Sequence, residues 1–167
     1  MTSKDYLKNQ ELYWDKRFKK EKFIWGKKTS ECSKDAVKKF QQYSNIHKIL
    51  VLGAGYGRNT KIFQDYGYDV DCLDISQKAI NLAKKFDIKT KFSKISILKM
   101  DKMKDFYDGI FGFEILHLFL AEDREKIINL CYDRLNPKGL IYQAVFSENE
   151  DTIGKIEVEP KTFKSRA

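Results

Sequence analysis

The order of apolar and polar positions along the chain predicts strands alternating with helices. Residues 49–52 form an unbroken apolar run, which is typical of a strand buried on both faces of a parallel sheet. Further strand patterns lie at 69–73, within 90–97, at 107–113 and at 140–146, and apolar residues at helical spacing predict helices over 59–66, 76–86 and 122–135. This alternation indicates an α/β fold with a doubly wound, mainly parallel sheet, and the right-handed crossover rule gives the strand order 3-2-1-4-5.

The segments on either side of this pattern differ from it. Most of the first 30 residues have helical spacing, up to Gly26, and a second helix is expected over 34–43 with Ser33 as its N-cap. Residues 136–139 are predicted to form a turn before the fifth strand, and 151–167 are polar and weakly patterned. We divide the single domain into an N-terminal helical cover (1–45), a sheet-forming core (46–147) and a polar tail (148–167).

Composition and charge narrow the class of protein. The 167 residues, 42% hydrophobic and 34% charged, are typical of one globular domain. The net charge of +8 comes from lysines scattered among acids, which favours a solvated surface over a nucleic-acid partner. No apolar run approaches the roughly 18 residues of a membrane span, and the N-terminus lacks a signal-peptide core, so we expect a cytoplasmic protein. Cys32, Cys72 and Cys131 form no C-x-x-C pair, so neither disulfides nor a metal site is suggested.

A glycine-rich loop follows the 49–52 strand. Gly53, Gly55 and Gly57 let the backbone turn sharply and approach a ligand closely, and the helix behind them offers free N–H groups at its N-terminus. Asp74, at the end of the next strand, can accept both hydroxyls of a ribose, which NAD and S-adenosylmethionine alike possess. Arg58 stands where a dinucleotide site has its third glycine, which argues against a nicotinamide-dependent oxidoreductase.

Several stretches together resemble class I S-adenosylmethionine-dependent methyltransferases, particularly their tellurite-resistance and thiopurine methyltransferase-like small-molecule branch. The similar stretches are 13–18 (YWDKRF), 25–26 (WG), 51–58 (VLGAGYGR), 73–75 (LDI), 107–117 (YDGIFGFEILH) and 135–140 (LNPKGL). The resemblance implies a Rossmann-like core, S-adenosylmethionine as cofactor, and transfer of its methyl group to a small molecule such as a thiol or a chalcogen oxyanion.

The resemblance also implies roles for individual residues. The glycine loop would meet the amino-acid part of the cofactor, Asp74 the ribose and Ile75 the adenine, while Phe113 and Glu114 would lie beside the transferable methyl group. Ser96 stands where the family often has an acid for the adenine amino group. The full set of implied cofactor contacts is Trp14, Arg17, Trp25, Gly53, Ala54, Gly55, Gly57, Asp74, Ile75, Ser96, Ile97 and Phe113.

Glu114 and His117 are the candidate catalytic residues. A thiol or selenide acceptor needs little help, whereas an oxygen or nitrogen acceptor can need a base. These two residues lie three apart on an expected helical turn and would share a face. His117 also lies in an apolar run, where a histidine can be a core residue with its hydrogen bonds satisfied.

The C-terminal part departs from the family. Class I methyltransferases usually continue past strand five with a helix and an antiparallel strand pair, but only about 20 residues follow Phe146 here. We therefore expect the strand pair to be missing, apart from one strand edge at 156–158, and the edge of strand five to be open. Truncation is the favoured explanation; the others are a homodimer that covers the edge and a degenerate fold.

Three alternatives to a small-molecule methyltransferase stay open. One is a methyltransferase whose acceptor is RNA or protein. Another is a module that binds the cofactor but is catalytically impaired, in keeping with the short C-terminal part. The third is the oxidoreductase, which Arg58 disfavours.

Overall fold

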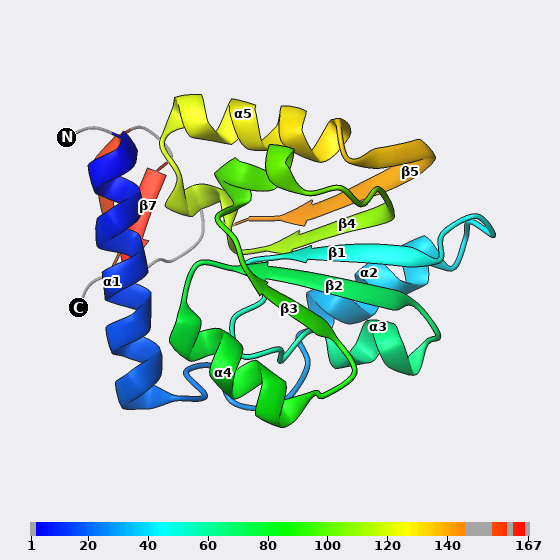
Figure 1. Ribbon diagram of the computed structural model, residues 1–167, viewed down its shortest axis with the longest axis horizontal. Coiled ribbons are helices and arrows are strands. Elements are labelled where there is room, and N and C mark those ends of the chain that lie inside the picture. The colour runs from blue at the N-terminus through cyan, green and yellow to red at the C-terminus, as the bar shows by residue number, and fades with distance from the viewer. Residues whose placement is uncertain (1–2, 146–154, 160–161, 166–167) are drawn as a thin grey trace.

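The computed structural model describes residues 3–145, 155–159 and 162–165. Its centre is a five-stranded sheet with helices on both faces, and the long helix α1 crosses one end of the sheet (Figure 1). The sheet contains β1 (Lys48–Leu52), β2 (Asp69–Asp74), β3 (Lys91–Lys94), β4 (Tyr107–Phe113) and β5 (Leu135–Ala144), in the order β3-β2-β1-β4-β5. All four neighbouring pairs are parallel, so the predicted doubly wound sheet is confirmed.

Helices cover the two faces because successive residues of each strand point to opposite sides. In β1, Ile49 and Val51 pack in one buried cluster, and Leu50 and Leu52 pack in another. The first cluster joins the sheet to α2 (Glu31–Phe40), α3 (Lys61–Asp65) and α4 (Gln77–Phe86). The second joins it to the 3-10 helix η1 (Ile97–Lys102) and to α5 (Ala121–Tyr132). Helix α1 (Ser3–Glu21) confirms the expected N-terminal helix.

The predicted N-cap of α2 is wrong. The helix begins at Glu31, and its N-cap is Ser30, whose hydroxyl accepts a hydrogen bond from the backbone N–H of Ser33 at 3.2 Å. An N-cap residue has an extended backbone, and its side chain accepts the N–H of the residue two or three positions further on. Ser30 meets both conditions. Ser33 is instead fully buried inside the helix.

The predicted turn at 136–139 is also wrong, because these residues belong to β5. Helix α5 ends at Tyr132, three residues earlier than expected, and Leu135 already pairs with Tyr107 of β4. The register then shifts before Leu140, and Lys138 adopts a left-handed φ of 67°. An edge strand tolerates such an irregularity, and also Pro137, because one side of it carries no ladder bonds.

A strand pair follows β5, against expectation. β6 (Lys155–Glu159) and β7 (Thr162–Ser165) pair antiparallel, and β6 confirms the strand edge predicted at 156–158. The pair forms a sheet of its own, and β7 contacts the short 3-10 helix that follows β4, η2 (Leu116–Leu118). Among the described residues β5 therefore has β4 as its one neighbour, while residues 146–154 lie outside the described part.

A polar network closes the amino end of the sheet, at the ends opposite to the glycine loop. The Tyr107 hydroxyl donates to Oδ2 of Asp71 at 2.9 Å, and the ammonium groups of Lys48 and Lys91 each lie 3.6 Å from the same oxygen. Asp105 contacts both lysines, at 3.5 and 3.3 Å. Burial and the Asp71 carboxylate together raise the pKa of Tyr107 far above its ordinary value, so the phenol stays protonated as a donor.

Across the residues that the structure describes, no helix combines the length and the apolar character that crossing a membrane requires.

Candidate functional site

A cavity of about 260 Å³ lies at the carboxyl ends of the central strands, where the strand order reverses. The loops after β1, β2 and β4 line it, together with α1 and Trp25. Except for Gly57, the structure brings every predicted site residue to this cavity: Trp14, Arg17, Trp25, Gly53, Ala54, Gly55, Asp74, Ile75, Ser96, Ile97, Phe113, Glu114 and His117.

The glycine loop is held in a conformation that side chains disfavour. Gly53, Gly55 and Gly57 have φ values of 60°, 56° and 81°, in the left-handed region that favours glycine. A Cβ on Gly53 would lie 2.6 Å from Cδ1 of Ile115, whereas one on Gly55 would meet only Phe18, at 3.6 Å. The loop therefore leaves backbone open to the cavity at Gly55.

Gly57 faces the interior of the protein. A Cβ there would lie 3.2 Å from both the Phe92 ring and the Thr60 hydroxyl oxygen. Its role is to let the loop pack against β3 and α3, so it supports the site from behind.

Asp74 joins the glycine loop to the turn after β2. One carboxylate oxygen accepts the N–H of Gly55 at 2.7 Å and the other accepts the N–H of Ser76 at 2.8 Å. The side chain is only 8% exposed, and this burial raises its pKa to about 6 although the N–H groups of Ser76, Gly55 and Ile75 act to lower it. The carboxylate is thus fixed in place at the cavity wall, and its pKa of about 6 lies within reach of physiological pH.

The adenine side predicted from the sequence lies along the next loops. Ile75 lines the cavity directly after Asp74, and Ser96 and Ile97 line it where η1 begins. Ser96 is the N-cap residue of η1, but its side chain makes no capping hydrogen bond. The lining at this point therefore includes a small hydroxyl residue, Ser96, next to the apolar Ile97.

Aromatic rings form the cover of the cavity. Trp25 stacks on Tyr56 with ring centroids 6.2 Å apart, and Trp14 lies 5.9 Å from Trp25. The Tyr56 hydroxyl is buried, donates to the carbonyl of Gly26 at 2.6 Å and accepts from the Trp25 N–H at 3.1 Å. These bonds fix the segment after α1, so that Trp25 stays over the site.

Two guanidinium groups approach the Trp25 ring. Arg17 lies 5.8 Å and Arg58 lies 5.9 Å from its centroid, and Arg58 also donates to the Trp25 carbonyl at 3.0 Å. Both arginines line the cavity, which gives it a cationic side. Arg58 was not among the predicted site residues, although its position directly after Gly57 was a usable signal.

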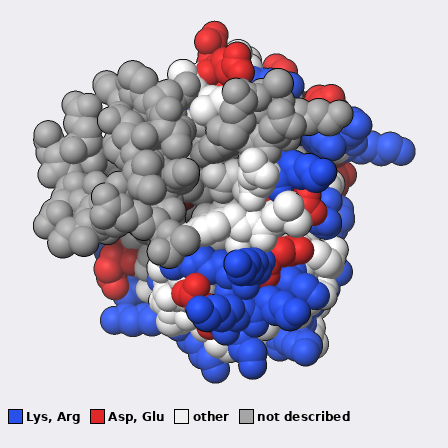
Figure 2. All heavy atoms as spheres, turned by 90° about the vertical axis from the view of Figure 1, so that its left-hand side faces the viewer, with Lys and Arg blue, Asp and Glu red and all other residues white. Residues whose placement is uncertain are grey.

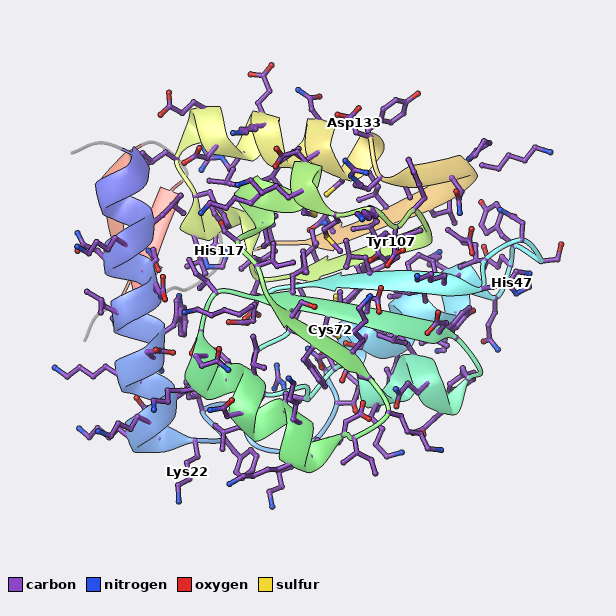
Figure 3. The ribbon with its side chains drawn as sticks, viewed as in Figure 1. Lys22, His47, Cys72, Tyr107, His117 and Asp133 are labelled. Atoms are coloured by element: carbon purple, nitrogen blue, oxygen red, sulfur yellow. The ribbon has the colours of Figure 1, made fainter. Side chains whose placement is uncertain are left out.

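Glu114 and His117 both line the cavity after β4, but not as one helical turn. Glu114 has φ 53°, which is unusual for a residue with a side chain, and its N–H donates to the carbonyl of Ala144 at 2.8 Å. The short 3-10 helix η2 (Leu116–Leu118) starts two residues later and carries His117. Figure 3 shows His117 at the end of the sheet nearest α1.

A glycine loop and a buried acid, set at the switch point of a 3-2-1-4-5 sheet, define the class of α/β domains that bind a nucleoside cofactor. Comparison with known families agrees with this geometry. The chain belongs to the methyltransferase domain family, whose model matches residues 49–139. That stretch runs from β1 into β5 and includes the glycine loop, Asp74, Glu114 and His117.

Solved methyltransferases share the fold at low sequence identity. The complex of DhpI with S-adenosylmethionine (SAM) and HEP matches with a TM-score of 0.68 and 18% identity, over 90% of this chain and 70% of that one. The SAM-bound magnesium protoporphyrin IX methyltransferase ChlM from Synechocystis matches at 0.65 and 14%, over 78% and 72%. CalS10, an amino pentose methyltransferase from Micromonospora echinaspora, matches at 0.65 and 14%, over 69% of this chain and half the length of that one. No curated protein matches the sequence significantly.

Proposed function

We propose that this protein transfers a methyl group from S-adenosylmethionine to a small-molecule acceptor, as a member of the tellurite-resistance and thiopurine methyltransferase-like branch. The observation that carries the proposal is the contact between Asp74 and the open backbone of Gly55 at the cavity wall. The match to the methyltransferase domain family and the methyltransferase folds of the structural neighbours support it.

The cavity wall suits the nucleoside part of this cofactor. Each carboxylate oxygen of Asp74 already accepts one backbone N–H, and since an ionised carboxylate has about four acceptor positions, capacity for two ribose hydroxyls remains. Ile75 and Ile97 would pack on the adenine ring, with the Ser96 hydroxyl beside its polar edge.

The opposite end suits the amino-acid part. The backbone at Gly53, Ala54 and Gly55 would lie against it, and Arg17 would pair with its carboxylate. Arg17 donates from Nε to Glu21 at 3.1 Å and from Nη1 to the Tyr13 hydroxyl at 3.4 Å, which leaves further N–H groups of the guanidinium for a ligand.

The bound cofactor supplies a methyl group on a sulfonium sulfur, which an acceptor displaces in line. The protein's own residues then have to align the acceptor and exclude water, and Trp14, Trp25 and Phe113 would do so. A thiolate acceptor needs no base. For an amine or a hydroxyl, Glu114 or His117 would take up the proton that the acceptor loses as its new bond to carbon forms.

A small acceptor is preferred over a nucleic acid because the basic surface is interrupted. Figure 2 shows lysine and arginine side chains gathered on part of the face that α1 covers, with acidic side chains between them. Ion pairs such as Lys94 with Glu11 at 2.7 Å reduce the net field of these groups.

Calorimetric titration with S-adenosylhomocysteine and with NADH tests the cofactor. We expect the first to bind and the second not to bind, and binding of NADH alone would overturn the assignment.

A panel of thiols, amines and hydroxyl compounds, scored by release of S-adenosylhomocysteine, then tests the acceptor. Glu114→Gln and His117→Asn should slow methylation of amines or hydroxyls and spare thiols if either side chain acts as a base. Binding without turnover of any acceptor class would instead support a non-catalytic binding module.

A further inference from the structure

Asp15 of α1 reaches across to the N-terminus of α4. One of its oxygens, Oδ1, accepts the hydroxyl of Ser76 at 2.5 Å and the backbone N–H of Lys78 at 3.0 Å. These partners lie 61 and 63 positions further along the chain, so the contact joins the N-terminal cover to the sheet-forming core. The negative charge also lies at the positive end of the α4 dipole.

Ser76 connects this contact to the cavity wall. It is fully buried, and its hydroxyl accepts the N–H of Ala79 at 3.1 Å as the N-cap of α4. Its own N–H donates to Asp74 at 2.8 Å. An uninterrupted hydrogen-bonded path therefore runs from Asp15 through Ser76 to Asp74, and Ile75, the residue between the last two, lines the cavity.

The same turn of α1 also forms the cover of the site. Trp14 and Arg17, which flank Asp15 along the helix, line the cavity, and Phe18 packs in a buried cluster with Tyr56. Movement of α1 would therefore displace the cover and the Ser76 contact together.

We propose that Asp15 is a positioning residue of the cofactor site, which holds α1 on α4 and thereby fixes the turn that carries Asp74 and Ile75. This inference rests on the proposed function, because it assigns Asp15 a role in binding the adenosyl cofactor. The role requires an acceptor oxygen at Oδ1, since both donors, the Ser76 hydroxyl and the Lys78 N–H, meet that one atom.

Two variants of Asp15 and one control test the role. Asp15→Ala removes the acceptor, and we expect S-adenosylhomocysteine to bind about tenfold more weakly. Losing an acceptor at a helix N-terminus typically costs a free energy equivalent to about that change, and here the same contact also orders the turn at the cavity. Asp15→Asn keeps an oxygen for both donors and should restore the affinity at pH 7.5. Glu11→Ala removes the ion pair that α1 makes with Lys94 of β3, and should change the affinity by less than about twofold because that pair is exposed.

Rescue by Asp15→Asn, not by Asp15→Ala, separates a positioning acceptor from a charge that merely supports the fold. The pH dependence adds a check on the placement of Asp15: burial is the main cause of the raised pKa of Asp74 and the charge of Asp15 is a small one in the same direction, so Asp15→Asn should slightly lower the pH at which binding is half-lost and leave the affinity at pH 7.5 intact. The other groups that face Asp74 or line its cavity are common to both proteins, namely the N–H groups of Gly55, Ile75 and Ser76 and the side chains of Arg17, Arg58, Glu114 and His117.

Docking of α1 can also be followed without a ligand. The protein has two tryptophans, Trp14 and Trp25, and both line the cavity, so acrylamide quenching of their fluorescence reports how closely the cover sits. We expect Asp15→Ala to increase quenching, with Asp15→Asn and Glu11→Ala matching the wild type.

Failure of the wild type to bind S-adenosylhomocysteine would refute the proposed function, whereas the quenching would still report on Asp15. Wild-type quenching and affinity in the Asp15→Ala protein would overturn the positioning role. If that variant does not fold, a loss of affinity in Asp15→Asn, which keeps the acceptor oxygen for both donors, would do so.

Discussion

Lowering the pH should weaken cofactor binding through Asp74. The ribose hydroxyls would donate to the ionised carboxylate, so binding favours the deprotonated form and holds the pKa of Asp74 lower in the complex than in the free protein. In the free protein burial raises that pKa to about 6, and below this pH the side chain must lose a proton before it can accept both hydroxyls. Affinity is therefore full above pH 7 and falls as the pH drops through 6.

The size of the effect follows from the two pKa values. If the complex restores the ordinary value of 3.8, the dissociation constant of S-adenosylhomocysteine at pH 5 should be about tenfold higher than at pH 7.5. The same raised pKa acts on the free energy of unfolding. The stability that the raised pKa contributes is complete below pH 3.8 and is lost as the pH rises through about 6. At neutral pH the free energy of unfolding is therefore roughly 3 kcal/mol lower than it would be if Asp74 kept its ordinary pKa.

Calorimetry at half-unit steps from pH 5 to 7.5, in two buffers of different ionisation enthalpy, measures both the affinity and the proton released on binding. The control is Asp74→Asn, which should bind more weakly at pH 7.5 and show no slope between pH 5 and 7. A wild-type affinity that stays constant over this range, or an equal slope in the Asp74→Asn protein, would refute the assignment of this titration to Asp74.

Three further substitutions separate the site from the fold. Gly55→Ala and Gly67→Ala both place a side chain at a left-handed φ, 56° and 87°, and each should lower the free energy of unfolding by about 1–2 kcal/mol in chemical denaturation. Only Gly55→Ala, at the cavity, should also weaken binding of S-adenosylhomocysteine in titration. Equal losses of binding in the two variants would contradict the placement of the cofactor. Tyr107→Phe removes the buried donor to Asp71 and should lower the free energy of unfolding by about 1–3 kcal/mol while ligand affinity stays at the wild-type value, because the network lies at the opposite end of the sheet.

The strand order and most of the site could be predicted because they depend on local signals. An apolar run, a glycine loop and an acid at the end of the next strand are contiguous patterns, and the topology then brings Asp74 to Gly55 without further information. The 136–139 stretch was misjudged because Asn, Pro and Gly indicate a turn locally, whereas pairing with β4 keeps these residues in an irregular edge strand.

The residues that sequence reasoning missed act through contacts between distant segments. Asp15 looks like one more charge on a solvated helix until the fold places it at the N-terminus of α4. The place of Arg58 directly after Gly57 indicates a residue near the site, but its contact with Trp25 depends on how the segment after α1 folds back. Spacing along the chain predicts neither the Asp15 contact nor the contact between Arg58 and Trp25.

The network of Tyr107, Asp71, Lys48 and Lys91 has a consequence for how this protein could change. It ties the starts of β1, β3 and β4 to β2 at the amino end of the sheet, away from the cavity, while the loops around the cavity follow the carboxyl ends of the strands. Substitutions that change acceptor preference would then fall on loops, where a loss of local packing leaves the strand pairing of the sheet intact. Such an arrangement favours divergence of specificity on a constant frame, and it marks the amino end of the sheet as the place to add stabilising substitutions before redesigning the pocket.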